Sequence, residues 1–188
     1  LKVVRVDPAF SGDYMCEVAL PNREITFVYN KEILQKLTHI IPQATAISIQ
    51  EALYSRDAQR LQKEMHRLLL QSTSCYDTAG ENFYHGFVLG LCAMMDNHYY
   101  ISSNGESGEG RYDIQLSPKM ENMPGILIEL KTARNISGDQ LKRLSEVALA
   151  QIQDRKYDTD MLSKGIKTIV KYGVAFSGKQ VEIAISSS

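Results

Sequence analysis

The stretch Gly125-Ile126-Leu127-Ile128-Glu129-Leu130-Lys131 decides the fold of this chain. Its apolar run predicts a central strand that is buried on both faces. A charged Glu129 and Lys131 at the end of such a strand do not suit a core. Because side chains alternate along a strand, residues two apart point to the same face. The segment therefore predicts a buried strand that presents a carboxylate and an ammonium side by side.

Before this strand, the sequence predicts one helix and two further strands. The helix is expected over 79–95, where apolar side chains recur at helical spacing. The strands are expected over 98–103 and 111–116, with a loop at 104–110 that holds three glycines. Strands so close in sequence favour an antiparallel meander.

After the strand, the pattern predicts a helix over 139–157, with Leu141, Leu144, Ala148 and Ile152 on one side. Two closing strands are expected over 166–176 and 180–185, joined by a hairpin turn at 177–179. The helix would then cross over to a further strand of the same sheet. This order predicts an α/β fold in which helices flank a mixed central sheet.

The N-terminal part divides into an extension at 1–48 and the start of the main domain, 49–188. The extension is expected to be a small α+β region with strands over 14–20 and 24–29 and a short helix over 31–37.

The main domain should open with a helix over about 49–71, because Ser48 and Glu51 have the spacing of a capping box. The residues expected to form its core-facing stripe are Ala58, Leu61, Met65 and Leu68.

Composition excludes several classes of protein. The chain has 188 residues, a formal net charge of -1 and 44% hydrophobic residues, as expected for one globular domain and not for a strongly basic nucleic-acid coat. It has neither an 18-residue apolar stretch nor a signal-peptide pattern, so we expect a cytoplasmic protein without a membrane partner. Three widely spaced cysteines, without a CxxC pair, fit a reducing compartment and make structural zinc an unlikely feature. The first residue is Leu1, which suggests a fragment of a longer protein.

A chemical site is expected where the strand containing Asp113 neighbours the strand containing Glu129 and Lys131. Two carboxylates held together repel each other unless a proton or a cation lies between them. A hard divalent ion such as Mg²⁺ takes oxygen ligands of this kind. The Lys131 ammonium would orient a water molecule or stabilise negative charge that develops on a phosphate.

The pattern resembles the PD-(D/E)XK nuclease superfamily. The matching segments are Gly110-Arg111-Tyr112-Asp113 and Ile128-Glu129-Leu130-Lys131, with Glu81 on the preceding helix. Gln151 followed by Tyr157 is similar to the Gln…Tyr motif of the exonuclease-like branch, with one residue more between them. The resemblance implies a restriction-endonuclease-like core over about 75–185.

The resemblance also implies roles for the residues of the site. Asp113, Glu129 and the backbone carbonyl of Leu130 would bind Mg²⁺ or Mn²⁺, with Glu81 as an additional ligand. Lys131 and Gln151 would complete the catalytic set. The segments 20–24 and 81–87 are similar to bacterial proteins that carry an AAA-ATPase-like domain in front of this one.

Nucleic acid, DNA in preference to RNA, is the implied substrate. The charge is uneven, at -4 over residues 81–131 and +4 over 132–180, which suits a metal site beside a surface that meets a phosphate backbone. The residues proposed to contact substrate are His85, Arg134, Lys142, Arg143 and Tyr157.

Each of these residues also has a structural interpretation. Glu81 fits a capping box with Thr78, and Asp113 can pair with Arg111. Glu129 and Lys131 can form a surface ion pair. Gln151, the basic residues and His85 can be ordinary solvated or structural residues, and Tyr157 can pack on the sheet. On this view the domain is a non-cleaving module that attaches an ATPase to nucleic acid or protein.

Overall fold

The computed structural model describes residues 2–8, 14–19, 43–72 and 81–187. The chain divides into two compact units, Leu1–Pro42 and Gln43–Ser188. In the first, β1 (Lys2–Pro8) pairs antiparallel with β2 (Tyr14–Ala19). Strand β2 confirms the strand predicted over 14–20, whereas β1 was not predicted. The elements predicted over 24–29 and 31–37 lie outside the described residues.

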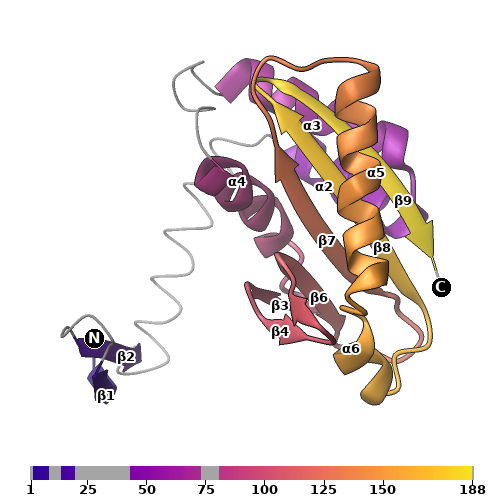
Figure 1. The fold of residues 1–188 in the computed structure, drawn as a ribbon. Coiled ribbons are helices and arrows are strands. Elements are labelled where there is room, and N and C mark those ends of the chain that lie inside the picture. Colours follow the sequence, from indigo (N-terminus) through magenta and orange to yellow (C-terminus); the bar gives the residue numbers. More distant parts are fainter. Residues whose placement is uncertain (1, 9–13, 20–42, 73–80, 188) are drawn as a thin grey trace. The chain divides into compact units, whose positions relative to one another are not determined.

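The second unit is built on a five-stranded sheet in the order β3-β6-β7-β8-β9 (Figure 1). The strands are β3 (Tyr99–Ser103), β6 (Ile114–Pro118), β7 (Gly125–Thr132), β8 (Ile169–Ser177) and β9 (Gln180–Ser187). All neighbours are antiparallel except β7 and β8, which are parallel and joined through helix α5 (Asp139–Asp154). The mixed sheet, the meander and the helical crossover are therefore confirmed.

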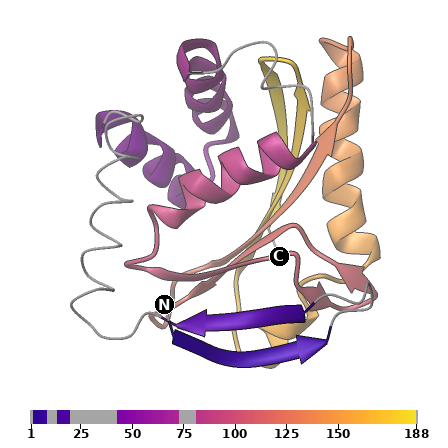
Figure 2. The same ribbon diagram turned by 90° about the vertical axis from the view of Figure 1, so that its left-hand side faces the viewer.

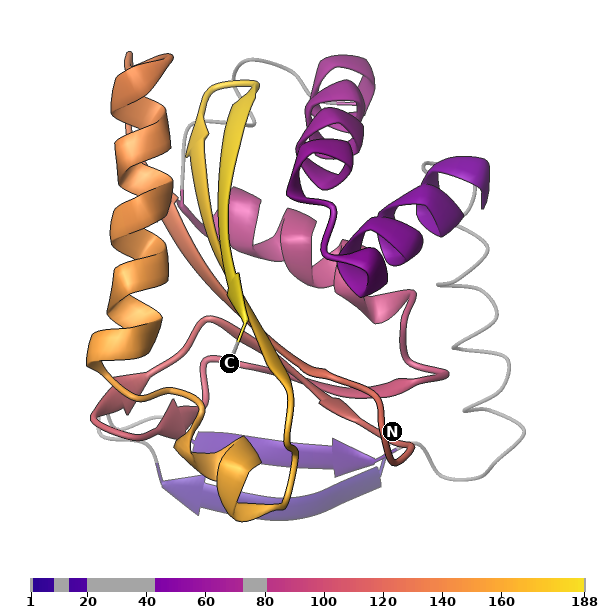
Figure 3. The ribbon, with the colours of Figure 1, turned by 90° about the vertical axis from the view of Figure 1, so that its right-hand side faces the viewer.

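Helices cover both faces of this sheet. Helix α5 lies on one face, and α2 (Gln43–Ser55), α3 (Ala58–Ser72) and α4 (Glu81–Ala93) lie on the other (Figures 2 and 3). On the α5 side, Gly173 lets the helix approach, because a Cβ there would stand 2.1 Å from the Ser145 carbonyl oxygen. On the opposite side, the Tyr172 hydroxyl donates to the Leu53 carbonyl at 3.0 Å. No helix of the described residues is long and apolar enough to cross a membrane.

The single helix predicted over 49–71 is wrong, since α2 and α3 replace it. Arg56, at φ 60°, ends α2, and the Asp57 carboxylate accepts a bond from the Arg60 backbone N–H to start α3. Ser48 is not a cap, because it lies inside α2, where its hydroxyl bonds Glu64. The predicted apolar stripe is confirmed on α3, where Leu61, Met65 and Leu68 are buried.

Several other boundaries and short elements differ from the sequence prediction. The glycine-rich loop contains a small hairpin of β4 (Glu106–Ser107) and β5 (Gly110–Arg111). Strand β6 begins at Ile114, so Asp113 precedes the strand instead of lying within it. Helix α5 ends at Asp154, and an unpredicted short helix, α6 (Thr159–Ser163), follows. Strand β8 begins three residues later than predicted, and helix α4 ends two residues earlier.

Candidate metal-dependent active site

The site lies where strands β6 and β7 separate. Their ladder ends at the pair Ile114 and Ile128, so Asp113 and Glu129 occupy the next opposing positions. Instead of continuing the ladder, the Asp113 Oδ2 atom accepts a hydrogen bond of 2.7 Å from the Leu130 backbone N–H. The two carboxylates are therefore held at the point where the sheet opens.

Glu129 is the most constrained acid of the site, with only 3% of the residue exposed. Its Oε1 atom accepts hydrogen bonds from Lys131 Nζ at 3.1 Å and from Gln151 Nε2 at 2.5 Å. Its Oε2 atom is buried and has no hydrogen-bond partner among the described residues. Since a buried polar atom without a partner is costly, this oxygen is a candidate ligand for a bound cation.

The electrostatics of Glu129 point to the same position. Burial is the main cause that raises the pKa of its carboxyl group to about 7, and the negative charge of Asp113 raises it further. The Lys131 ammonium acts in the opposite direction without restoring the ordinary value. Two adjacent carboxylates in a dry site favour either a shared proton or a cation.

Helix α5 supplies Gln151, which also contacts Glu129. The Gln151 amide donates both to Glu129 and to the Tyr157 hydroxyl, the latter at 3.0 Å. Tyr157 is buried beside Gly110, where a Cβ atom would stand 3.3 Å from the Tyr157 hydroxyl. Tyr157 therefore contacts Gln151 and the glycine of the β4–β5 hairpin, as well as packing in the core.

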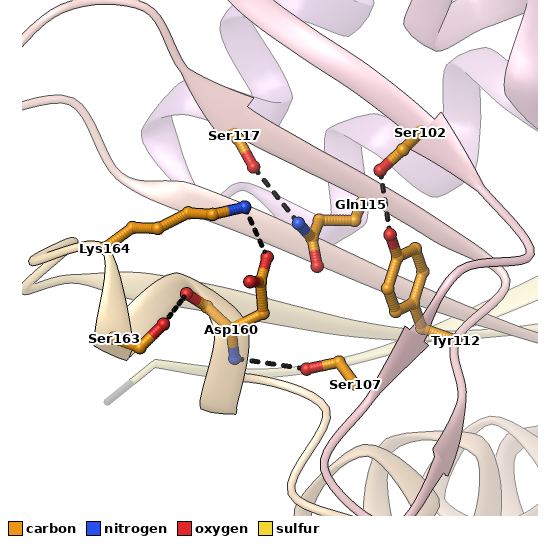
Figure 4. Close-up of polar contacts among 8 residues, drawn as sticks. All are labelled: Ser102, Ser107, Tyr112, Gln115, Ser117, Asp160, Ser163 and Lys164. Carbon is orange, nitrogen blue, oxygen red and sulfur yellow. Dashed lines mark hydrogen bonds and ion pairs between the residues drawn. The ribbon is translucent and has the colours of Figure 1, made fainter.

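The backbone of Asp113 is fixed by residues that the sequence prediction missed. Its carbonyl accepts a hydrogen bond from the Asn104 backbone N–H at 2.9 Å, and Asn104 adopts a positive φ of 55°. The neighbouring Tyr112 bonds Ser102 through its hydroxyl at 3.0 Å (Figure 4). A Cβ on Gly105 would stand 2.2 Å from that hydroxyl. The three-glycine loop was a visible signal, but only the structure shows that Gly105 faces Tyr112 and Gly110 faces Tyr157.

The other residues proposed for the site are exposed or contact only its backbone. His85 lies 3.3 Å from the Asp113 carbonyl through Nε2, so it touches the backbone of the site. Glu81 is exposed in the first turn of α4. Among the described residues, no group of three carboxylate, imidazole or thiol side chains is close enough to share an ion. Arg134, Lys142 and Arg143 are exposed on α5 or the loop before it.

The structural alternatives can be compared with these contacts. Within the described ranges no ion pair joins Arg111 to Asp113, and Glu129 and Lys131 are paired although Glu129 is buried, so they do not form a surface pair. Residues 78–80, which would complete the capping box of Glu81, lie outside the described part.

The donors at the opening fit a hard divalent cation. They are all oxygens: the Asp113 carboxylate, Glu129 Oε2 and the carbonyl of Leu130. The N–H and C=O of a strand residue face the same neighbour, so the Leu130 carbonyl faces the side from which its N–H binds Asp113. Oxygen-only sets of this kind suit Mg²⁺ or Mn²⁺ better than zinc or copper.

Comparison with known proteins gives one family. Residues 79–185, more than half of the chain, match the family model described as PD-(D/E)XK nuclease superfamily. No curated protein matches the chain. The matched segment contains the β6–β7 opening, α5 and the two residues that donate hydrogen bonds to Glu129, Lys131 and Gln151.

Proposed function

Because the chain belongs to the PD-(D/E)XK nuclease superfamily, we propose that it hydrolyses phosphodiester bonds of nucleic acid with a bound Mg²⁺ or Mn²⁺ ion. The observation that carries the proposal is the buried Glu129 carboxylate. One of its oxygens has no partner in the described part of the chain, and Asp113 lies opposite it. A merely structural carboxylate would have both oxygens satisfied or would reach solvent.

Asp113, Glu129 and the Leu130 carbonyl would hold the ion, and Glu81 is proposed as a further ligand. A divalent ion in such a site lowers the pKa of water and neutralises charge on phosphate oxygens. The rest of the chemistry belongs to the side chains of this chain.

Lys131 would act on the reacting atoms. Its side chain is 30% exposed, so the ammonium reaches the surface while remaining 3.1 Å from Glu129 Oε1. It would donate to the attacking water or to the phosphate oxygen on which negative charge develops. Gln151 would keep Glu129 Oε1 occupied, so that Oε2 faces the opening.

Finer features of the proposal rest on the sequence alone. They are DNA in preference to RNA, an AAA-ATPase-like domain in the same full-length bacterial protein, an extension at 1–48 ahead of a nuclease-like domain at 49–188, and a cytoplasmic location. His85, Arg134, Arg143 and Tyr157 remain proposed substrate contacts.

Metal binding and cleavage test the proposal together. Mn²⁺ or Ca²⁺ should raise the melting temperature of the wild type, because a free ion at 100 times Kd adds about 2.7 kcal/mol to the free energy of unfolding. Asp113→Asn should weaken this effect, and Asp113→Asn combined with Glu129→Gln should abolish it. Glu146→Gln, which neutralises an exposed carboxylate on α5, is the matched control.

Cleavage should be assayed with full-length protein on linear, circular and single-stranded DNA and on RNA. Wild type and Glu146→Gln should cut at least one substrate with Mg²⁺ or Mn²⁺, and the double variant should cut none. If the ion stabilises the double variant as well as the wild type, the metal site is wrong. If the wild type binds DNA and cuts no substrate, the non-cleaving module is the correct function.

A further inference from the structure

A polar groove lies at the β9 edge of the sheet, away from the catalytic residues. It has a volume of about 630 Å³ and is bordered by α3, by the beginning of α5 and by the first residues of β9. The family match and the metal site do not account for it.

Bases outnumber acids among the titratable residues that line this groove. Lys63 and His66 come from α3, Lys142 comes from α5, and Glu182 of β9 is the single acid among the lining residues. Lys63 and Lys142 are exposed, and neither has an ion-pair partner among the described residues. Two ammonium groups facing one hollow without acidic partners favour an anionic ligand.

Hydrogen-bond donors on the same walls fit phosphate oxygens. His66 Nδ1 lies 2.8 Å from the Lys179 carbonyl, so this nitrogen carries the proton that it donates. In the neutral ring Nε2 is then an acceptor and offers no proton to a phosphate, so His66 borders the groove without serving as a phosphate donor. Gln59, Gln62 and Gln180 add side-chain amides to the lining. Lysines and side-chain amides are among the groups that contact the phosphates of nucleic acids without reading the sequence.

The groove is in line with the catalytic lysine. Lys131 pairs with Ala175, and Ala175 pairs with Glu182, so these three residues form one row across β7, β8 and β9. Two strand spacings make the row about 10 Å long. This length corresponds to about three base-pair steps of a duplex at 3.4 Å each.

We propose that the groove between α3 and α5 binds the phosphate backbone of the nucleic-acid substrate, a few nucleotides from the bond that is cut. This inference rests on the proposed nuclease function and adds to it a second contact, outside the metal site. Binding there is independent of sequence and sensitive to salt, because it is made through lysines to phosphates.

The test compares two double variants, each of which replaces two lysines by glutamate, one variant in the groove and the other at another hollow. Lys63→Glu with Lys142→Glu changes the groove. Lys119→Glu with Lys167→Glu makes the same change at another hollow, of about 640 Å³, near the start of β7. Binding of a fluorescein-labelled DNA duplex is measured in EDTA, to prevent cleavage, over about 50–200 mM NaCl. Far-ultraviolet circular dichroism and the Mn²⁺-induced rise in melting temperature check that each variant folds and retains the metal site.

The groove variant should bind roughly tenfold more weakly or worse, and its plot of log affinity against log salt should be shallower by about 2, one for each lysine. The control variant should bind like the wild type. Equal affinity and equal salt slope for the groove variant and the wild type would overturn the groove, even if the wild type cuts DNA. The same loss in both variants would also overturn it, since binding would then follow net charge.

The proposed nuclease function fails separately. If the wild type binds the duplex and only the groove variant loses that binding, the groove is supported whether or not the wild type cleaves. If the wild type does not bind the duplex in EDTA or in Ca²⁺, the groove proposal is wrong, and cleavage of another substrate would leave the nuclease function intact. A variant that unfolds is replaced by Lys63→Gln with Lys142→Gln, for which half of the slope change or more is expected.

Discussion

Two lysine–carboxylate pairs lie on the α5 face of the sheet, and they differ in how completely they are satisfied. Lys171 of β8 bonds Asp158 at 2.7 Å, and their side chains are 8% and 16% exposed. Lys131 of β7 bonds Glu129 at 3.1 Å, with side chains 30% and 4% exposed. The first pair leaves no buried orphan among the described atoms, whereas the second leaves Glu129 Oε2 without a partner. A buried carboxylate is part of the structure in one case and part of a proposed site in the other.

The surroundings of the two pairs agree with this difference. Asp158 directly precedes the short helix α6, in which Asp160 makes several hydrogen bonds. The Asp160 backbone N–H donates to Ser107, its carboxylate pairs with Lys164, and its carbonyl accepts from Ser163 (Figure 4). The Lys164 ammonium also lowers the pKa of the Asp160 carboxyl. Around Glu129, by contrast, burial and a second acid raise the pKa, so a further cation there would favour the ionised form.

Lys131→Ala should give the largest effect, and it acts on the rate. Removing one preorganised donor to developing negative charge costs about 3–4 kcal/mol of barrier, or two to three decades of cleavage rate. The measurement is the steady-state cleavage rate with Mg²⁺, expressed per folded molecule for the variant and for the wild type. Lys167→Ala, an exposed lysine outside the site, should cut like the wild type. A cleavage rate for Lys131→Ala equal to that of the wild type would remove Lys131 from the mechanism.

Lys171→Met should instead lower stability. It leaves the mostly buried Asp158 without its ammonium, and breaking such a pair costs about 3 kcal/mol. Chemical denaturation measures the loss, and the double change Lys171→Met with Asp158→Leu should recover most of it, because no unpaired charge then remains. The cleavage rate per folded molecule should not change. A rate loss like that of Lys131→Ala would show that the two pairs are not functionally distinct.

The contrast between the pairs also shows how far the sequence could predict the site. The Glu129 and Lys131 pair was visible because two charges end an apolar strand, and the alternation of a strand puts them on one face. The Asp158 and Lys171 pair was not visible, since its partners are joined only when α6 returns to the sheet. Helix α6 itself was missed because five residues are too few to show a helical period.

Boundaries failed for a similar reason. Arg56 ends α2 through its backbone conformation, which a stripe of apolar residues on both sides of it does not reveal. Asp113 was placed within a strand because polar and apolar residues alternate there. The real β6 begins one residue later, where the carboxylate has turned to the Leu130 N–H. The order of strands survived these errors, because it depends on burial and connection length and not on exact ends.

Glu129→Gln sharpens the comparison through pH. The folded protein raises the carboxyl pKa from 4.5 to about 7, so in this interval it holds a proton that the unfolded chain has released. Metal-free wild type should therefore lose stability as pH rises from 4.5 to 7, by about 1–3 kcal/mol, and then level off. Glu129→Gln should lack this loss, so its melting temperature in EDTA should exceed that of the wild type at pH 8 and approach it at pH 4.5.

Added Mn²⁺ should reverse the order at pH 8, since the ion stabilises only the carboxylate form. Asp158→Asn is the control from the other pair, because it removes a satisfied carboxylate and should lower stability at pH 8. If Glu129→Gln lowers the melting temperature at pH 8 in EDTA, the Glu129 carboxylate is a stabilising structural group like Asp158.

Tyr157→Phe should give the smallest effect. It tests whether the Tyr157 hydroxyl helps Gln151 to hold Glu129, while Glu129 itself is unchanged. The substitution removes a hydroxyl that accepts a 3.0 Å bond from Gln151 and leaves the ring in the core. A neutral hydrogen bond contributes about 1 kcal/mol to stability, so the denaturation midpoint should fall slightly. Since Gln151 keeps its bond to Glu129, the cleavage rate of Tyr157→Phe should fall only a few-fold, as measured in the same cleavage assay.

Gly110→Ala is the informative companion, because its new Cβ would stand 3.2 Å from the Tyr157 ring and displace the ring that Gln151 contacts. Its rate should fall further than that of Tyr157→Phe, although no polar contact has been deleted. Equal rates for wild type, Tyr157→Phe and Gly110→Ala would mean that Gln151 holds Glu129 without help from Tyr157.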